Sequence, residues 1–473
     1  MDTPIKKIVG LKKSDFDNSI KSPGGIRLRR ARLIPLTKPG DEMTLTSIFL
    51  ASLKLVQEFK QHLFKELKLQ NGGRVYVYTE VAFPEFKESR IDGLILVVKA
   101  GVIKDAAILE MKNKNNLLEQ EQVERYIQIA RALKIPKLIT ISNQFVSALT
   151  QSPLKLKPLK SVQVFHMSWS YIMTLAHVLL FKNETNIRDE DQVKIMEEIV
   201  AYLESSVSGV SGVTQMRAGW DELTKNIHAG SHIKISDPLV NEAVLSWHQQ
   251  ERDMALMLSR KVGVFVKSGQ KKFKSDLAGR LTSDCKKLVD SKCLDSTLVV
   301  KNAVSDVQVK GHFEKKSVEM SVNIFIPSDK TVKGQIGWMK RQIENCRKKY
   351  SGSGLSADID SLINSELKID INIKHSKNKI RVPFNSFDSV LDEINKKELN
   401  GFSVVLVRDF RRNFGSRKNF VVTLETMLLD FYRGFVEHLV NWKQPSPKVS
   451  EDNYFSDIEY FIEHCEISID DPV

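Results

Sequence analysis

The sequence places an aspartate, a glutamate and a lysine at the ends of two consecutive apolar segments. Residues 94–98 and 106–109 are uniformly apolar, which predicts two neighbouring strands that are buried on both faces. Asp92 precedes the first segment, and Glu110 and Lys112 follow the second. Side chains two residues apart point to the same side of a strand, so Glu110 and Lys112 should emerge together. An acid and a base ending a buried strand are costly unless they are paired or take part in a reaction.

Two carboxylates on adjacent strands suit a hard cation such as Mg²⁺ or Mn²⁺, which takes oxygen ligands and usually keeps several waters. Such a cation polarises a phosphoryl oxygen and lowers the pKa of an attacking water. Lys112 can orient that water and offset charge in the transition state. Gln122 and Tyr126, four residues apart on a predicted helix, share one face and can contact the phosphate or support the lysine. The pattern predicts phosphodiester hydrolysis.

An aspartate on one strand followed by Glu-x-Lys on the next resembles the PD-(D/E)xK nuclease superfamily, which has the fold of restriction endonucleases. The stretch from Gln122 to Tyr126, QVERY, is similar to the Gln-x-x-x-Tyr element of the RecB-like branch. Ile91 stands where the proline that gives the superfamily its name would be, a position that the superfamily tolerates losing. The resemblance implies a Mg²⁺-dependent phosphodiesterase acting on DNA, with Asp92 and Glu110 as metal ligands.

The resemblance further implies an additional acid from the first core helix. Glu42, near the start of that helix, is the candidate and Glu58 is the alternative, although either also fits a surface position. Glu80, near the end of a predicted strand at 74–81, can join the metal site or face the solvent. Arg90, which opens the next strand, is a candidate DNA contact.

Glu-x-Lys by itself carries little information, because this sequence repeats it elsewhere. The other copies begin at Glu58, Glu66, Glu85, Glu314 and Glu366. Only the copy at Glu110 follows an Asp-bearing strand and precedes a helix and a further strand. The alternative for Glu110 is a surface ion pair at a strand end, which would contribute little to stability.

Composition favours a soluble protein with a polyanionic partner. The 473 residues are 42% hydrophobic and 27% charged, and they carry a net charge of +13 with a pI near 9.3. This charge favours nucleic acid as the partner. An anionic membrane surface is the rival, but no apolar run approaches the ~18 residues needed to span a bilayer. We therefore expect no membrane partner.

The cysteines and histidines do not form a metal or disulfide pattern. Cys285, Cys293, Cys346 and Cys465 are scattered, which argues against a zinc ribbon, an iron–sulfur cluster or a disulfide framework. His228 and His232 have ligand spacing but no third ligand nearby in the sequence, so chance spacing is the simpler interpretation. With no apolar segment typical of a secretory signal at the start, we expect a cytoplasmic setting.

The elements that must position the candidate residues follow the order αβββαβ between residues 44 and 142. A helix is predicted at 44–69, then a strand at 74–81, the two strands ending in the candidate triad, the helix with Gln122 and a strand at 137–142. This predicts an α/β fold with a mixed sheet covered by helices on both faces, the restriction-endonuclease-like core.

The remaining chain suggests further units. We expect a basic arm at 1–40, the nuclease-like domain at 41–235, a bridging helix at 236–265, an α+β domain for nucleic-acid or partner binding at 266–445, and an acidic tail at 446–473. A Ser/Gly-rich stretch at 205–213 is interpreted as a hinge or loop.

Basic residues gather in two places that suit phosphate contacts. The arm carries Lys6, Lys7, Lys12, Lys13, Arg27, Arg29, Arg30 and Arg32. A predicted loop carries Arg408, Arg411, Arg412, Arg417 and Lys418, interleaved with Phe410 and Phe414. Basic residues with aromatics suit backbone contact and base stacking. The alternative is a solvated face in the loop, and a solvated leader in the arm.

The leading hypothesis is a Mg²⁺-dependent deoxyribonuclease in restriction, repair or bacterial defence against foreign DNA, a context that comes from the resemblance alone. The alternative is a catalytically silent protein of the same fold that binds DNA or assembles a complex. An RNA-acting relative is also compatible with the chemistry. The sequence leaves open whether a helicase, an ATPase or another defence protein acts with this chain, and whether it forms homo-oligomers.

Overall fold

The computed structural model describes residues 6–443 with short gaps. The gaps are residues 31–32, 34–37, 39, 87–88, 115, 147, 158–160, 182–185, 270–272, 274–275, 377 and 395–396. The expected acidic tail and Arg32 therefore lie outside the described residues, as do Cys465 and the side chain of Arg30.

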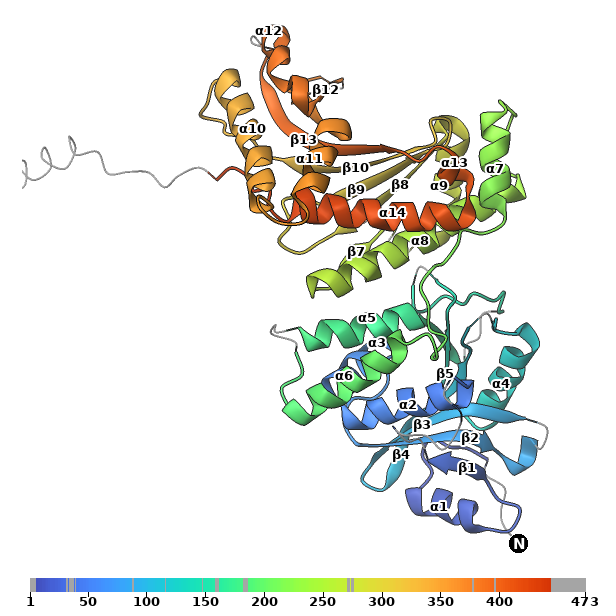
Figure 1. Cartoon of the computed structure of the whole chain (residues 1–473). Coiled ribbons are helices and arrows are strands. Elements are labelled where there is room, and N and C mark those ends of the chain that lie inside the picture. Colours follow the sequence, from blue (N-terminus) through green and yellow to red (C-terminus); the bar gives the residue numbers. More distant parts are fainter. Residues whose placement is uncertain are drawn as a thin grey trace, which may run out of the picture.

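The protein is a mixed α/β structure with two sheets, one of them mixed, as the sequence predicts at this level (Figure 1). The first sheet has the order β1-β2-β3-β4-β5-β6. Its strands are β1 (Arg27–Arg30), β2 (Arg74–Ala82), β3 (Arg90–Lys99), β4 (Val102–Met111), β5 (Lys137–Ser142) and β6 (Gln163–Ser168). Neighbours from β1 to β4 are antiparallel, and the pairs β4–β5 and β5–β6 are parallel.

Helices cover both faces of this sheet. They are α1 (Lys13–Lys21), α2 (Glu42–Leu55), α3 (Gln57–Glu66), α4 (Gln120–Ala132), α5 (Trp169–Leu180) and α6 (Glu190–Glu204). Side chains of α2, α3, α5 and α6 pack on one face, and those of α1 and α4 pack on the other. Double coverage explains why β3 and β4 are apolar on both sides.

The structure corrects two expectations in this half. The helix expected at 44–69 is divided into α2 and α3, because Val56 is extended, with φ −117° and ψ 111°, and its side chain is buried in the core. The expected arm at 1–40 contributes α1 and β1 to the first half. Ile8, Phe16 and Ile26 are buried in the same core as strand residues of the sheet, so the described part of the arm is not a solvated leader.

The second sheet is antiparallel with the order β12-β11-β13-β10-β9-β8-β7. Its strands are β7 (Lys267–Ser268), β8 (Cys293–Val299), β9 (Val307–His312), β10 (Ser317–Ile324), β11 (Leu367–Ile373), β12 (Lys379–Pro383) and β13 (Leu399–Asp409). Its helices are α7 (Gly219–His228), α8 (Pro238–Val262), α9 (Leu277–Ser291), α10 (Val332–Lys349), α11 (Ser356–Ser365), α12 (Leu391–Ile394), α13 (Arg412–Gly415) and α14 (Arg417–Phe431). Burial alternates along β8, β9 and β10, which is typical of a sheet with one covered face.

Two helical segments of this half are irregular. Helix α14 ends at Phe431 and continues as a π-helical turn, Tyr432–Val436. A 3-10 segment, Phe384–Val390, precedes α12. The short helices α7 and α11 were not anticipated, because each has few apolar residues and no strong boundary signal in the sequence.

Helix α8 follows α7 in the second half, packs against α5 of the first half and contributes to both cores (Figure 1). Leu256 packs in the core of the first half, whereas Trp247 and Met254 pack in the core of the second. Asp253 is buried and accepts hydrogen bonds from Ser170 Oγ at 2.8 Å and from the Val213 backbone N–H at 2.6 Å. The expected bridging helix therefore contributes core side chains to each half. None of the described helices combines the length and the hydrophobicity needed to cross a bilayer.

We predict that Asp253→Ala lowers the midpoint of thermal unfolding by about 5 °C or more, because it leaves the Val213 N–H without its acceptor and the half-buried Arg260 without the nearby negative charge. Asp290→Ala removes an exposed acid from α9 and serves as the control, with an expected effect within about 0.5 kcal/mol. Equal midpoints for the two variants, measured by differential scanning calorimetry, would contradict a bridging role for Asp253.

Candidate active site

The structure brings Asp92, near the start of β3, together with Glu110 and Lys112 at the end of β4. Asp92 Oδ2 accepts a hydrogen bond from the Met111 backbone N–H at 2.8 Å. Lys112 Nζ lies 3.0 Å from Glu110 Oε1 and 3.6 Å from Glu42 Oε2. Two carboxylates thus contact one ammonium group, and a third, that of Asp92, lies beside Glu110.

Glu110 is fully buried, and Asp92, Lys112 and Glu42 are half-buried, which excludes the exposed surface ion pair considered above. Glu110 is 0% exposed, and burial next to Asp92 raises its pKa to about 9. Burial also raises the pKa of Asp92, although the Met111 N–H opposes that shift. Burial disfavours the charged form of Lys112, but the carboxylates of Glu110, Glu42 and Asp92 outweigh it, and the pKa of Lys112 is raised. At neutral pH the ammonium is charged and the two strand carboxylates compete for a proton.

The backbone on either side of the Lys112 side chain is fixed by neighbouring elements. Its N–H donates to Ile141 O at 2.8 Å, which extends the parallel pairing of β4 with β5. Its carbonyl accepts a hydrogen bond from Trp169 Nε1 at 2.8 Å. Trp169 is fully buried at the start of α5 and packs edge-on against Phe49, with ring centroids 6.0 Å apart. Sequence reasoning missed Trp169, because nothing local links residue 169 to residue 112.

Glu42 joins the cluster from the first turn of α2. Its Oε2 lies near Lys112, and its Oε1 accepts a hydrogen bond from Asn116 Nδ2 at 2.6 Å. The alternative acid, Glu58, lies on α3 and lines a different pocket with Gln61 and His62. Of the two candidates, Glu42 is the one that the fold brings to Lys112.

Gln122 and Tyr126 lie on the face of α4 that approaches the cluster. Gln122 Nε2 donates to the Tyr126 hydroxyl at 3.3 Å, and that hydroxyl donates to Arg90 O at 2.6 Å. Burial, followed by the charges of Asp92 and Glu110, raises the pKa of Tyr126, so its phenol stays neutral. Tyr126 thus ties α4 to the start of β3, two residues before Asp92.

Glu80 pairs with Arg90 instead of contacting the triad. Glu80 Oε2 lies 2.8 Å from Arg90 Nε. Glu80 has a φ of +55° inside β2, an uncommon conformation for a non-glycine residue and one that marks local strain. The strand pairs Thr79–Gly93 and Val81–Ile91 bracket Glu80 and Asp92, which brings Glu80 to the level of Asp92. The Arg90 side chain is 65% exposed and remains accessible to a ligand.

The loop that follows Lys112 is held by the Ser/Gly-rich stretch at 205–213. Lys114 N–H donates to Gly209 O at 2.9 Å, and Asn113 Nδ2 donates to Ser208 O at 3.0 Å. Gly209 has a φ of +68°, and a Cβ there would lie 2.4 Å from Lys114 Cγ. This stretch is a loop, as one of the two interpretations had it, and it packs against the active-site loop.

The donor set fits a hard divalent cation in part. Among the described residues no group of three or more His, Cys, Asp or Glu side chains is arranged to hold a metal ion. Mg²⁺, however, is usually held by one or two carboxylates together with waters. Neither oxygen of Glu110 accepts a hydrogen bond of good geometry within the described structure, although Oε1 lies close to Lys112 Nζ. The nearby positive charge is thus too small to neutralise both carboxylates, Asp92 and Glu110, when both are ionised.

The basic segment at 408–418 is largely structural, and in place of the expected loop it comprises the end of β13, α13 and the start of α14. Arg408 forms ion pairs with Glu366 at 2.8 Å and Asp430 at 3.0 Å, and Arg417 Nε donates to Met216 O at 2.7 Å. The remaining cations, which are exposed, are Arg411, Arg412 and Lys418. The interleaved aromatics, which are buried in the core and so cannot stack on bases, are Phe410 and Phe414.

Comparisons with known protein families, with curated proteins and with solved structures found no match for this chain.

We predict that Glu110→Gln stabilises the protein at alkaline pH. Between its usual pKa near 4.5 and its folded pKa of about 9, Glu110 is protonated in the native state and ionised in the unfolded state. Native stability therefore falls as pH rises through this interval, and the variant lacks that loss. In thermal unfolding with a chelator present, we expect a gain on the order of 1–3 kcal/mol at about pH 8.5 and a smaller one at about pH 5.

Glu121→Gln, an exposed acid on α4, is the matched control and should show no pH-dependent gain. A Glu110→Gln protein that is less stable than the wild type at about pH 8.5 would contradict the buried-carboxylate interpretation.

Proposed function

We propose that this chain is a Mg²⁺- or Mn²⁺-dependent nuclease of the PD-(D/E)xK type that hydrolyses phosphodiester bonds in DNA. The observation that carries the proposal is the convergence of Asp92 with Glu110 and Lys112, which the antiparallel pairing of β3 with β4 brings together. Their pKa shifts are of the kind found at catalytic sites.

The order of elements around the site also supports the proposal. The chain runs α2, α3, β2, β3, β4, α4 and β5, which is the expected αβββαβ order with its first helix divided. Asp92 comes from the second of the three antiparallel strands and Glu110 from the third, and α4 carries Gln122 and Tyr126 back to the same place. We infer a restriction-endonuclease-like core from this correspondence.

Each side chain has a role that follows from its surroundings. Asp92 and Glu110 would hold the metal ion, which when bound supplies a Lewis acid for the phosphoryl group and an acidified water. Lys112 is fixed at its backbone on both sides, so its ammonium can orient a water and offset developing negative charge. Glu110, followed by Glu42, raises the pKa of that ammonium and so favours its charged form. Tyr126 is a neutral phenol and positions β3 through Arg90 O.

The test is cleavage of linear, circular and single-stranded DNA with Mg²⁺ or Mn²⁺, with the wild type compared with Lys112→Ala. We expect the variant to cut at least about 100-fold more slowly while binding DNA as before, because it lacks the cation that stabilises the transition state. Lys104→Ala, an exposed lysine at the other end of β4, should cut like the wild type.

Equal cutting by the wild type and Lys112→Ala would mean that this site does not carry the reaction. Salt-sensitive DNA binding without cutting by any of the proteins would favour the silent DNA-binding alternative. RNA cleavage in place of DNA cleavage would move the proposal to the RNA-acting relatives.

Trp169→Phe tests whether the backbone of Lys112 must be fixed. The change keeps an aromatic ring but removes the hydrogen bond to Lys112 O, so we expect a stability loss of about 1 kcal/mol and a lower kcat with little change in KM. Trp220→Phe is the control, since Trp220 Nε1 donates to Phe414 O at 2.7 Å in the other half. A similar stability loss in both variants with an unchanged kcat for Trp169→Phe would reject the positioning role.

A further inference from the structure

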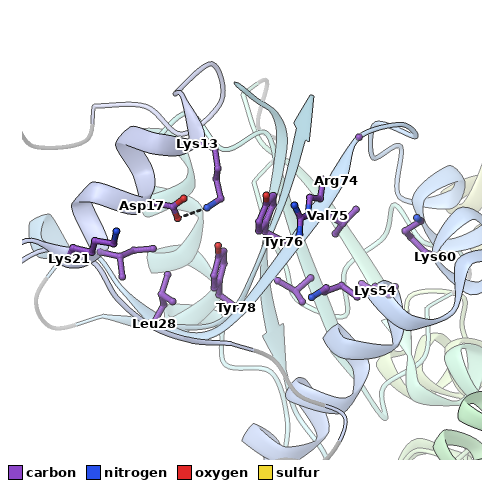
Figure 2. A pocket seen from close by; sticks show the side chains of 14 residues that line it. Lys13, Asp17, Lys21, Leu28, Lys54, Lys60, Arg74, Val75, Tyr76 and Tyr78 are labelled. Carbon is purple, nitrogen blue, oxygen red and sulfur yellow. Dashed lines mark hydrogen bonds and ion pairs between the residues drawn. The ribbon is translucent and has the colours of Figure 1, made fainter. Parts of the chain in front are cut away.

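A second charged feature lies at the opposite end of β2 from Glu80. A pocket of 720 Å³ is floored by Gly73 and the first five residues of β2 and bounded by α1 and β1 on one side and by α2 and α3 on the other (Figure 2). We call it the β2 groove. Its charged lining residues are Lys13, Lys21, Lys54, Lys60, Arg74 and Asp17. Five cations thus face one carboxylate.

Most of the positive charge in the β2 groove is uncompensated. Asp17 pairs with Lys13. Within the described part of the chain, none of the other four cations forms an ion pair, and Lys21, Lys54 and Arg74 are exposed. These cations come from four separate elements, so the fold, not one charged run in the sequence, assembles the positive surface.

The aromatic floor holds cations in place. Lys13 Nζ lies 4.4 Å from the centroid of the Tyr76 ring, and Arg74 Cζ lies 5.4 Å from it. Cation–π contacts of this kind fix the positions of side chains that would otherwise be mobile. Because Tyr76 is engaged by protein cations and Tyr78 is buried, the floor offers no free ring for base stacking. The β2 groove is therefore suited to phosphate groups and not to bases.

The dimensions favour a chain of phosphates over a single small anion. The floor, Gly73 followed by the first five residues of β2, spans roughly 17 Å, a length over which one strand of a duplex presents about five phosphates. From Tyr76 the strand continues for roughly 13 Å to Glu80, which lies at the level of Asp92.

We propose that the β2 groove binds the sugar–phosphate backbone of a nucleic-acid strand, without regard to the sequence of its bases. The bound nucleic acid would lie on β2, the β-strand that leads to the candidate active site. The identity of the ligand as nucleic acid rests on the proposed function, whereas the location of the binding surface rests on the groove alone.

The experiment measures fluorescence anisotropy of a labelled single-stranded oligodeoxynucleotide about 20 nucleotides long, which exceeds a typical single-strand site. The full-length protein is used in EDTA, so that cleavage does not enter the measurement. The groove variant combines Lys21→Ala, Lys54→Ala and Lys60→Ala, which removes exposed or half-buried cations that have no ion-pair partner among the described residues. The control variant combines Lys286→Ala, Lys301→Ala and Lys315→Ala, exposed lysines of the second half. Both variants lower the net charge equally.

We expect the groove variant to bind about 10-fold or more weakly near 0.1 M salt, and the slope of log K against log salt to fall in magnitude by about 2, because three phosphate contacts are lost. The control variant should keep the wild-type slope. Equal behaviour of the two triple variants would overturn the proposal, because only net charge would then matter.

Two further ligands test whether the groove binds negatively charged groups other than a nucleic-acid strand. Inorganic phosphate should compete only at high concentration, and phosphatidylserine vesicles should not bind in place of the oligonucleotide. Strong competition by phosphate would indicate a small-anion site, and groove-dependent vesicle binding would indicate a membrane surface; either result would overturn the strand proposal. If cleavage depends on Lys112 but the groove variant binds the oligonucleotide as tightly as the wild type, the groove proposal fails and the nuclease proposal stands. If binding depends on the groove but no protein cleaves DNA, the nuclease proposal fails and the groove proposal stands.

Discussion

A fully buried carboxylate, that of Glu110 at the end of β4, lies beside the half-buried carboxylate of Asp92 at the start of β3, and this pair sets the constraint on which the first half of the structure depends. Asp92 and Glu110 cannot both be ionised there without a compensating cation, and the ammonium of Lys112 provides only one positive charge for three acids. The surrounding elements hold this arrangement in place. Met111 fixes Asp92, β5 and Trp169 fix the backbone of Lys112, and α2 delivers Glu42. Such a site is less stable than an apolar one of the same volume, which is the usual relation between function and stability.

The parts of this site that lie on regular elements could be predicted from the sequence. The apolar runs on either side of Asp92 and Glu110 indicate buried strands, and the spacing of Gln122 and Tyr126 indicates one helix face. The choice between Glu42 and Glu58 could not be made, because it depends on where the first helix begins and on the break at Val56. Trp169 could not be found at all, since its hydrogen bond to Lys112 depends on the packing of α5 against the sheet.

Charge was the least reliable guide to function in the sequence. The run at 408–418 looked like a nucleic-acid contact, yet Arg408 and Arg417 hold strands and helices together and the neighbouring phenylalanines are core residues. Of the cations of the β2 groove, by contrast, only Lys13 belongs to a cluster that the sequence singles out, whereas Lys21, Lys54, Lys60 and Arg74 are scattered along the chain. A local run of charge reports composition, whereas a binding surface needs unpaired charges that several elements bring together.

Helix α8 has a consequence for how the chain is made. The last strand of the first sheet ends at Ser168. The hydroxyls of Ser170 and Thr174 on α5 and the Val213 N–H, however, form hydrogen bonds with Asp253 and Arg260 of α8, which are synthesised much later. During synthesis at 5–20 residues per second, the interval between Ser168 and Val262 lasts roughly 5–20 s. Throughout that time the nascent first half lacks both the partners of these polar groups and Leu256, the α8 side chain that packs in its core.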